Sequence, residues 1–233
     1  MKKTTNNIFD GYADDYDAAL AEGISVSGED KDYFVRGRVE WLRGCLANQE
    51  TAPARIMDYG CGTGSSAPHL LEALRAESIV GTDQSPKSLE IARKTFRSEH
   101  FRFVAIDDCP PDASFDLAFC NGVFHHIAPG LRDEAVAYIF RSLRPGGIFA
   151  FWENNPWNPG TRLVMRRIPF DRDAATLSAP AAKRLLRKGG FEILRTDFLF
   201  IFPRTLRRLR WIEPRCSSLP IGAQYQVLCR KPV

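Results

Sequence analysis

The sequence predicts an α/β fold built on a doubly wound, mostly parallel sheet, and three observations support this. A glycine-rich turn at 60–64 follows the short apolar run 54–57 and precedes a helix-like segment. A second apolar run ends in Asp83, about twenty residues beyond the last glycine, where doubly wound folds place a carboxylate. Three further strand-like segments follow in order, so the chain has the succession of elements that such a sheet requires.

Each expected element has a local signal. After the first run, strands are expected at 78–83, 101–106, 115–120 and 148–152, and the last of these follows a helix that Pro145-Gly146-Gly147 stops. Helices are expected at 30–46, from near Pro86, and at 179–188, where Gly189-Gly190 ends the helix. The runs 191–202 and 224–230 are expected to be the last two strands.

The segment Asp58-Tyr59-Gly60-Cys61-Gly62-Thr63-Gly64 places an acidic residue before glycines at every second position. Glycine adopts the dihedral angles of such a turn without a Cβ penalty and lets a bulky ligand approach the main chain. The spacing differs from the G-x-G-x-x-G of dinucleotide-binding loops. It resembles motif I of the class I S-adenosylmethionine-dependent methyltransferases, and the resemblance covers residues 54–153 closely and the rest loosely.

The resemblance implies a seven-stranded sheet, S-adenosylmethionine as cofactor, a ribose contact at Asp83 and adenine contacts at Gln84, Asp107 and Asp108. Two alternatives stay open: Asp83 could cap the helix near Pro86, and the paired acids could form a solvated turn. The cofactor-binding residues implied by the resemblance are Tyr12, Tyr16, Asp58, Gly60, Gly62, Gly64, Asp83, Gln84, Asp107, Asp108 and Asn121.

Three polar residues lie on the edge where open α/β sheets bind ligands. His125 and His126 follow the fourth expected strand, and Glu153 lies at the end of the fifth. They are the candidate catalytic residues. A hydroxyl acceptor would need a base, for which a histidine with an apparent pKa near 6–7 is suited, whereas an amine or carboxylate needs mainly positioning. One histidine can instead pack or cap the following helix, and Glu153 can be a base, a substrate anchor or an acceptor that orients the loop.

We expect a helical N-terminal cap over residues 1–50 and a methyltransferase domain over 51–233, with an insertion at about 154–178. The start of the chain is similar to a lid found in small-molecule methyltransferases, with Tyr12 and Tyr16 on one helix face. The segment 203–211 mixes arginines with leucines and a tryptophan. It is typical of a solvated basic loop, although it could also lie on an anionic membrane or grip an acidic substrate.

The composition and charge are typical of a single α/β domain and do not indicate a membrane-spanning or nucleic-acid-binding protein. The 233 residues are 44% hydrophobic, enough for one α/β domain, and contain no run long enough to cross a membrane and no signal-peptide pattern. Six cysteines without a C-x-x-C pair indicate reduced thiols in a cytoplasmic protein, with no metal site expected. A formal charge of +4 is too small to indicate nucleic-acid binding.

The sequence therefore predicts methyl transfer from S-adenosylmethionine to a small-molecule or lipid-like acceptor, with oxygen as the expected acceptor atom. No nucleic-acid partner is expected, and membrane contact is at most peripheral. Two alternatives from other classes remain at this point: a nucleic-acid-directed methyltransferase, and a non-catalytic protein that only binds the cofactor.

Overall fold

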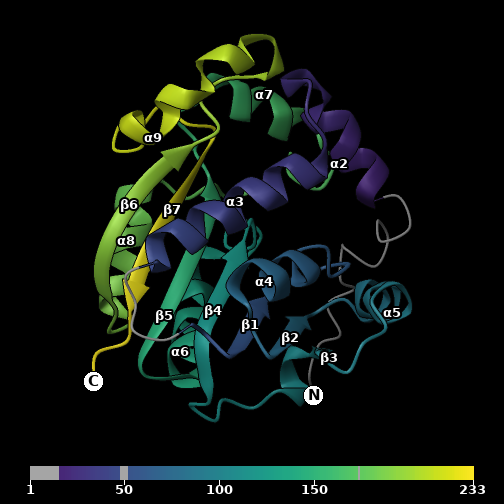
Figure 1. Cartoon of the computed structure of the whole chain (residues 1–233), viewed down its shortest axis with the longest axis vertical. Coiled ribbons are helices and arrows are strands. Elements are labelled where there is room, and N and C mark those ends of the chain that lie inside the picture. Colours follow the sequence, from purple (N-terminus) through teal and green to yellow (C-terminus); the bar gives the residue numbers. More distant parts are fainter. Residues whose placement is uncertain (1–15, 48–51, 173) are drawn as a thin grey trace.

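The computed structural model describes residues 16–47, 52–172 and 174–233 (Figure 1). Seven strands form one sheet in the order β3-β2-β1-β4-β5-β7-β6. Neighbours from β3 to β5 are parallel, whereas β7 is antiparallel to both β5 and β6. The strands are β1 (Arg55–Tyr59), β2 (Ser78–Asp83), β3 (Phe101–Ala105), β4 (Phe115–Asn121), β5 (Leu143–Asn154), β6 (Glu192–Leu199) and β7 (Gln224–Arg230). The mostly parallel sheet and the antiparallel pair at one edge confirm the predicted fold class.

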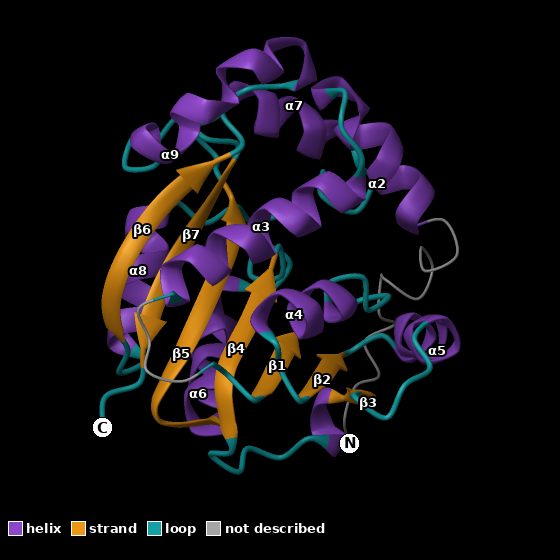
Figure 2. Ribbon diagram, viewed as in Figure 1, coloured by secondary structure: helices purple, strands orange, loops and turns teal. Residues whose placement is uncertain are grey.

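Helices cover both faces of the sheet (Figure 2). On one face lie α3 (Lys31–Leu46), α4 (Ala67–Leu74) and α5 (Pro86–Thr95), and on the other lie α6 (Arg132–Ser142) and α8 (Ala179–Lys188). Alternate residues of β5 enter two cores, because successive side chains of a strand point to opposite faces. Phe149 and Phe151 pack with the α6–α8 side, while Ala150 and Trp152 pack with the α3–α4 side.

The remaining helical segments are short and lie outside the two layers that cover the sheet. They are α2 (Tyr16–Ile24), α7 (Pro159–Arg167), α9 (Glu213–Cys216) and the 3-10 segments η1 (Ser25–Ser27), η2 (Ile106–Asp108), η3 (Pro129–Leu131) and η4 (Arg204–Ile212). Apart from η2 and η3, these segments form an arch above the arrowheads of the central strands in Figure 1. A Cβ on Gly23 would lie 2.3 Å from Ile168, so α2 and the end of α7 approach closely.

The N-terminal region has two packing environments. Val39 and Leu42 of α3 are buried in the same core as Ile56 of β1, so this helix packs directly on the sheet. Helix α2 instead contacts α7 of the insertion. Residues 1–15, including Tyr12, lie outside the described residues, and the side chain of Tyr16 is not described, so the lid function and the domain division at residue 50 stay predictions.

Two segments differ from the sequence-based expectation. The strand expected to reach residue 202 ends at Leu199, because Phe200 has a φ of +61° and its left-handed backbone turns the chain out of the sheet. Of the segment 203–211, expected as a loop, residues 204–211 lie within η4. Arg210 holds this segment by hydrogen bonds to the Phe202 carbonyl and to Glu29. Among the helices that the structure describes, none is long and apolar enough to cross a membrane.

Candidate functional site

The glycine loop connects β1 to α4 and has a left-handed backbone at each glycine, with φ of +72° at Gly60, +52° at Gly62 and +80° at Gly64. A Cβ on Gly60 would lie 2.4 Å from Val123, so this glycine packs against the segment after β4. A Cβ on Gly62 would meet no atom within 4 Å. A side chain at Gly62 would therefore be strained by its φ alone, since the space beside it is open.

Asp83 lies at the carboxyl end of β2 and holds this loop. Its Oδ2 accepts a hydrogen bond from the Gly62 amide at 2.8 Å, and its Oδ1 accepts one from the Ser85 amide at 2.8 Å. Ser85 is the residue that caps α5, through a bond from the Ser88 amide to its hydroxyl. Ser85, and not Asp83, therefore caps α5. The ribose contact at Asp83 stays a prediction.

Asp58 and Asn121 lie at the ends of β1 and β4, where the strand order reverses and open α/β sheets bind ligands. Burial of Asp58, which is 2% exposed, raises its pKa to about 7, with Asp83 adding to the shift and Arg38 opposing it. Within the described part of the chain, Asp58 Oδ2 and Asn121 Oδ1 are buried without a hydrogen-bond partner. Such unpaired acceptors fit a ligand that brings hydrogen-bond donors, as the ammonium, ribose hydroxyl and adenine amino groups of the expected cofactor would.

The other predicted cofactor residues lie along the same edge of the sheet. Gln84 is exposed after β2, and Asp107 and Asp108 are exposed in η2, directly after β3. Because β2 and β3 are parallel neighbours, the two acids and Asp83 follow adjacent strand ends. Their predicted contacts with adenine remain untested by this geometry.

Glu153 is fully buried at the end of β5 and orients the segment that follows β4. Its Oε1 accepts bonds from the backbone amides of Phe124 at 2.8 Å and His125 at 3.3 Å. Its Oε2 lies 2.7 Å from His125 Nδ1 and also accepts the Asn154 amide at 3.2 Å. Of the three roles considered for Glu153, this geometry matches the acceptor that orients the loop.

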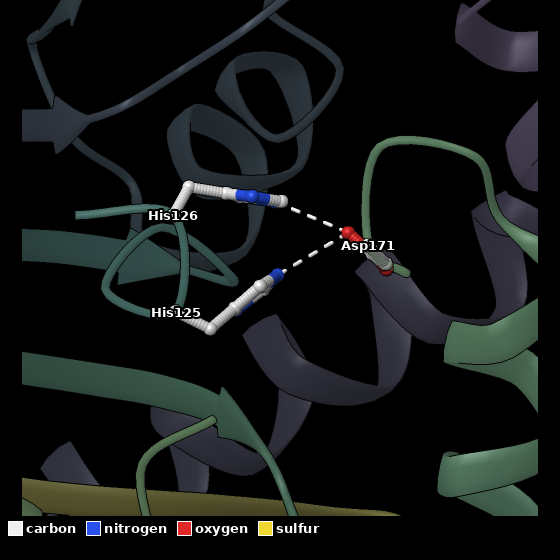
Figure 3. Close-up of side chains that lie close together, drawn as sticks. All are labelled: His125, His126 and Asp171. Carbon is white, nitrogen blue, oxygen red and sulfur yellow. Dashed lines mark hydrogen bonds and ion pairs between the residues drawn. The ribbon is translucent and has the colours of Figure 1, made fainter. Parts of the chain in front are cut away.

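Both histidines point toward Asp171, a residue of the insertion that the sequence analysis did not select (Figure 3). Asp171 Oδ1 lies 3.1 Å from His126 Nε2 and 3.4 Å from His125 Nε2. The chain after α7 is brought here by the Ala175 amide, which donates to the His125 carbonyl at 3.0 Å. No spacing or composition signal in the sequence indicates this contact, because Asp171 is 46 residues from His125.

The charges of this cluster depend on its burial. Burial opposes protonation of His125, but the Glu153 carboxylate and Asp171 outweigh it and raise the pKa of His125 to about 10. Burial lowers the pKa of His126. Burial would raise the pKa of Asp171, but hydrogen bonds from both histidines lower it to about 2. The expected apparent pKa of 6–7 is therefore wrong for His125, which carries its proton at neutral pH when the cluster holds no other ligand.

A cavity of about 330 Å³ lies next to this cluster, under the arch formed by α2, α7 and the segment after β6. His125, His126 and Asp171 line one end of it, together with Asn121 and Gly122 from the end of β4. The rest of its wall is mainly apolar and includes Ile24, Phe34, Val164, Ile168, Phe170 and Phe202. The segment that follows β4 contacts both regions, since Val123 packs on Gly60 while Gly122, His125 and His126 line the cavity.

Comparison with known proteins supports this arrangement. Residues 56–147 match a family model described as a methyltransferase domain. A trans-aconitate 2-methyltransferase of Methylobacterium nodulans is 36% identical over 138 residues, which cover 57% of this chain and 51% of that protein. A fatty-acid O-methyltransferase of Mycolicibacterium smegmatis is 27% identical over 157 residues, which cover 66% of this chain and 55% of that protein. The chain thus spans about half the length of these two curated relatives.

The fold also matches solved structures. An S-adenosylmethionine-dependent methyltransferase from Mesorhizobium loti superimposes with a TM-score of 0.60 at 20% identity, covering 84% of this chain and 99% of that one. The matched family region contains the glycine loop, Asp83 and the segment after β4. These agreements identify residues 56–147 as a methyltransferase domain, and the fold is that of the class I S-adenosylmethionine-dependent methyltransferases, whose cofactor is S-adenosylmethionine.

Proposed function

We propose that the protein transfers a methyl group from S-adenosylmethionine to a carboxylate oxygen of a small, mainly apolar acid. The cavity of about 330 Å³ beside the cluster carries this proposal. It is of the size that a small ligand needs, it is mostly apolar, and its polar end adjoins the carboxyl end of β4. A chain with a cavity of this size and lining is better suited to a small acceptor than to a nucleic acid.

Charge in the cavity wall favours an anionic acceptor. Three basic side chains line it, Lys31, Arg38 and Arg210, against the acids Glu29 and Asp171. Glu29 pairs with Arg210 at 2.8 Å, so that pair adds little net charge. The apolar wall would hold the body of the acid, and the basic residues would favour its carboxylate.

A carboxylate acceptor also requires the fewest catalytic groups from the protein. The sulfonium of the cofactor is already a strong electrophile, so alignment of the two reacting atoms supplies most of the rate. A carboxylate brings a nucleophile without a proton to lose, and no base is required. Glu153, which accepts bonds from three backbone amides and one imidazole, is therefore assigned to positioning.

The names of the two curated relatives support the same class of acceptor, since one is a trans-aconitate methyltransferase and the other a fatty-acid O-methyltransferase. On the cofactor side, the proposal includes the contacts predicted for the glycine loop, Asp83, Gln84, Asp107 and Asp108. It also includes the lid contacts of Tyr12 and Tyr16, of which the structure describes neither side chain. The six unpaired cysteines support the expected cytoplasmic location.

The test is a panel of matched acids, alcohols and amines, each incubated with the full chain and methyl-labelled cofactor. We expect the label in the acids alone, in a product that releases labelled methanol on treatment with alkali, because methyl esters hydrolyse there and methyl ethers and amines do not. Alkali-stable label would contradict the carboxylate acceptor. Labelling of a mixed tRNA pool would contradict the small-molecule acceptor as well.

A further inference from the structure

The geometry points to a binding site for one divalent transition-metal ion, held by His125 Nε2, His126 Nε2 and Asp171 Oδ1. Within the described ranges, these three residues form the one group of His, Cys, Asp or Glu side chains close enough to hold a metal ion. Their ligand atoms all lie within 4.8 Å of one another. In Figure 3 the two imidazole rings and the carboxylate converge from two separate segments of the chain.

The distances suit direct coordination. Asp171 Oδ1 lies 3.1 Å from His126 Nε2 and 3.4 Å from His125 Nε2. Ligand atoms at about 2.0–2.1 Å from a tetrahedral zinc ion are separated by about 3.3–3.4 Å. Two of the three separations are therefore close to those of a zinc site, and the imidazole nitrogens of the two histidines lie within 4.8 Å of each other.

Glu153 prepares His125 for this role. Metal binding requires a ring nitrogen without a proton, and the hydrogen bond of the other nitrogen decides which one that is. His125 Nδ1 lies 2.7 Å from Glu153 Oε2, so the proton on Nδ1 points to Glu153 and Nε2 faces Asp171. Glu153 is itself held by three backbone amides, as carboxylates behind metal-bound histidines usually are.

The three residues leave room for an outside ligand. His125 and Asp171 are 3% and 7% exposed, while the side chain of His126 is 16% exposed, and all three line the cavity. Three protein ligands with one open position are typical of sites where an ion binds a further molecule. Two imidazoles and one carboxylate suit zinc, iron(II) or manganese(II) better than magnesium or calcium.

The same distances also suit a cluster in which the histidines simply donate hydrogen bonds to Asp171. The two arrangements differ in one measurable way, because only the first binds an ion with defined stoichiometry. The inference does not depend on the proposed acceptor, since metal binding can be measured without cofactor or substrate.

The test uses the full chain after chelation, titrated with zinc by calorimetry and with cobalt(II) by absorption spectroscopy. We expect one ion per chain, and visible cobalt bands of the intensity typical of four- or five-coordinate nitrogen–oxygen sites. Asp171→Asn and His126→Ala should each lower the zinc affinity by at least about 10-fold. Glu153→Gln should lower it by about 10–100-fold, the range for residues that orient a metal ligand.

His100→Ala is the matched control, since this histidine is exposed and, in the described structure, its imidazole ring bonds only to the Glu77 carbonyl. It should leave the affinity and the cobalt spectrum unchanged. Circular dichroism of each variant shows whether it folds. If Asp171→Asn fails to fold, His126→Ala gives a second test of the same site. Zinc binding that is absent, or equally strong in His126→Ala and in the unaltered chain, would overturn the inference in favour of the hydrogen-bonded cluster.

Discussion

The edge of the sheet where the parallel strands end has a predicted cofactor side, at the ends of β1, β2 and β3, and a proposed acceptor side, at the ends of β4 and β5 and the start of β7. On the cofactor side, short connections directly after the strands carry the predicted binding residues, and the main bond, from the Gly62 amide to Asp83, joins residues 21 apart. On the acceptor side, Asp171 meets His125 from 46 residues away and Arg210 meets Glu29 from 181 residues away. The first side is held by local backbone geometry and the second by long-range contacts, so mutations on the two sides should have different effects.

The largest effect is expected from Glu153→Gln on the acceptor side. This change removes the charge that accepts from His125 and three backbone amides, and breaking a buried charged pair typically costs about 3–5 kcal/mol. Urea denaturation should therefore show a free energy of unfolding lower by that amount. Glu192→Gln, which breaks an exposed pair with Arg230, is the control and should cost less than about 1 kcal/mol. Equal losses in both variants would argue against a buried network.

The next effect is a pH dependence on the cofactor side. Burial, reinforced by Asp83, raises the pKa of Asp58 to about 7 from an ordinary value of 3.8, so folding favours its neutral form. The stability from this group is complete below about pH 4 and is lost as the pH rises to 7 and above. At about 1.4 kcal/mol per pKa unit, the loss amounts to at most roughly 4 kcal/mol.

Denaturation measured at several pH values checks this, with Asp58→Asn as the comparison. The variant has no group to titrate at this position, so its stability should change less between pH 4 and 7 than that of the unaltered chain. A pH profile that is the same in both proteins would show that Asp58 titrates near its ordinary value.

Asp83→Ala should weaken cofactor binding by about 2–3 kcal/mol, the range for losing charge-assisted hydrogen bonds. The carboxylate holds the Gly62 amide and is predicted to accept from the ribose. Calorimetry with S-adenosylmethionine measures the affinity, and Asp133→Ala, which alters an exposed acid paired with Lys188, is the control. Unchanged affinity in Asp83→Ala would rule out the ribose contact and leave Asp83 as a residue that only supports the loop.

The smallest effect is expected at the pair that links η4 to the segment before α3. Arg210 and Glu29 are 22% and 15% exposed, and pairs near the surface contribute about 0.2–1 kcal/mol. A double-mutant cycle with Arg210→Ala and Glu29→Gln should give a coupling energy in this range. KM for the acceptor should rise more than the affinity for S-adenosylmethionine falls, since both residues line the cavity and neither lies at the glycine loop. If the affinity for S-adenosylmethionine changed more than KM for the acceptor, the division of the edge into a cofactor side and an acceptor side would be wrong.

The sequence by itself determined the α/β class, most of the strands and helices, and the position of the glycine loop. These features depend on local patterns: apolar runs, glycine at left-handed positions such as Gly60, and a carboxylate at the end of β2. It also indicated His125, His126 and Glu153, because the ends of parallel strands share one edge of the sheet.

Only the tertiary structure decided what these residues do to one another. In the structure, Ser85 caps α5 and β6 ends at Leu199. The fold also places Asp171 next to the two histidines, whereas the cysteine pattern leads us to expect no metal site. The carboxylates of Glu153 and Asp171 then raised the pKa of His125 far above its ordinary value, against the opposing effect of burial. Local patterns specify backbone geometry within a few residues, whereas long-range contacts and burial depend on how the whole chain packs, and no spacing in the sequence encodes them.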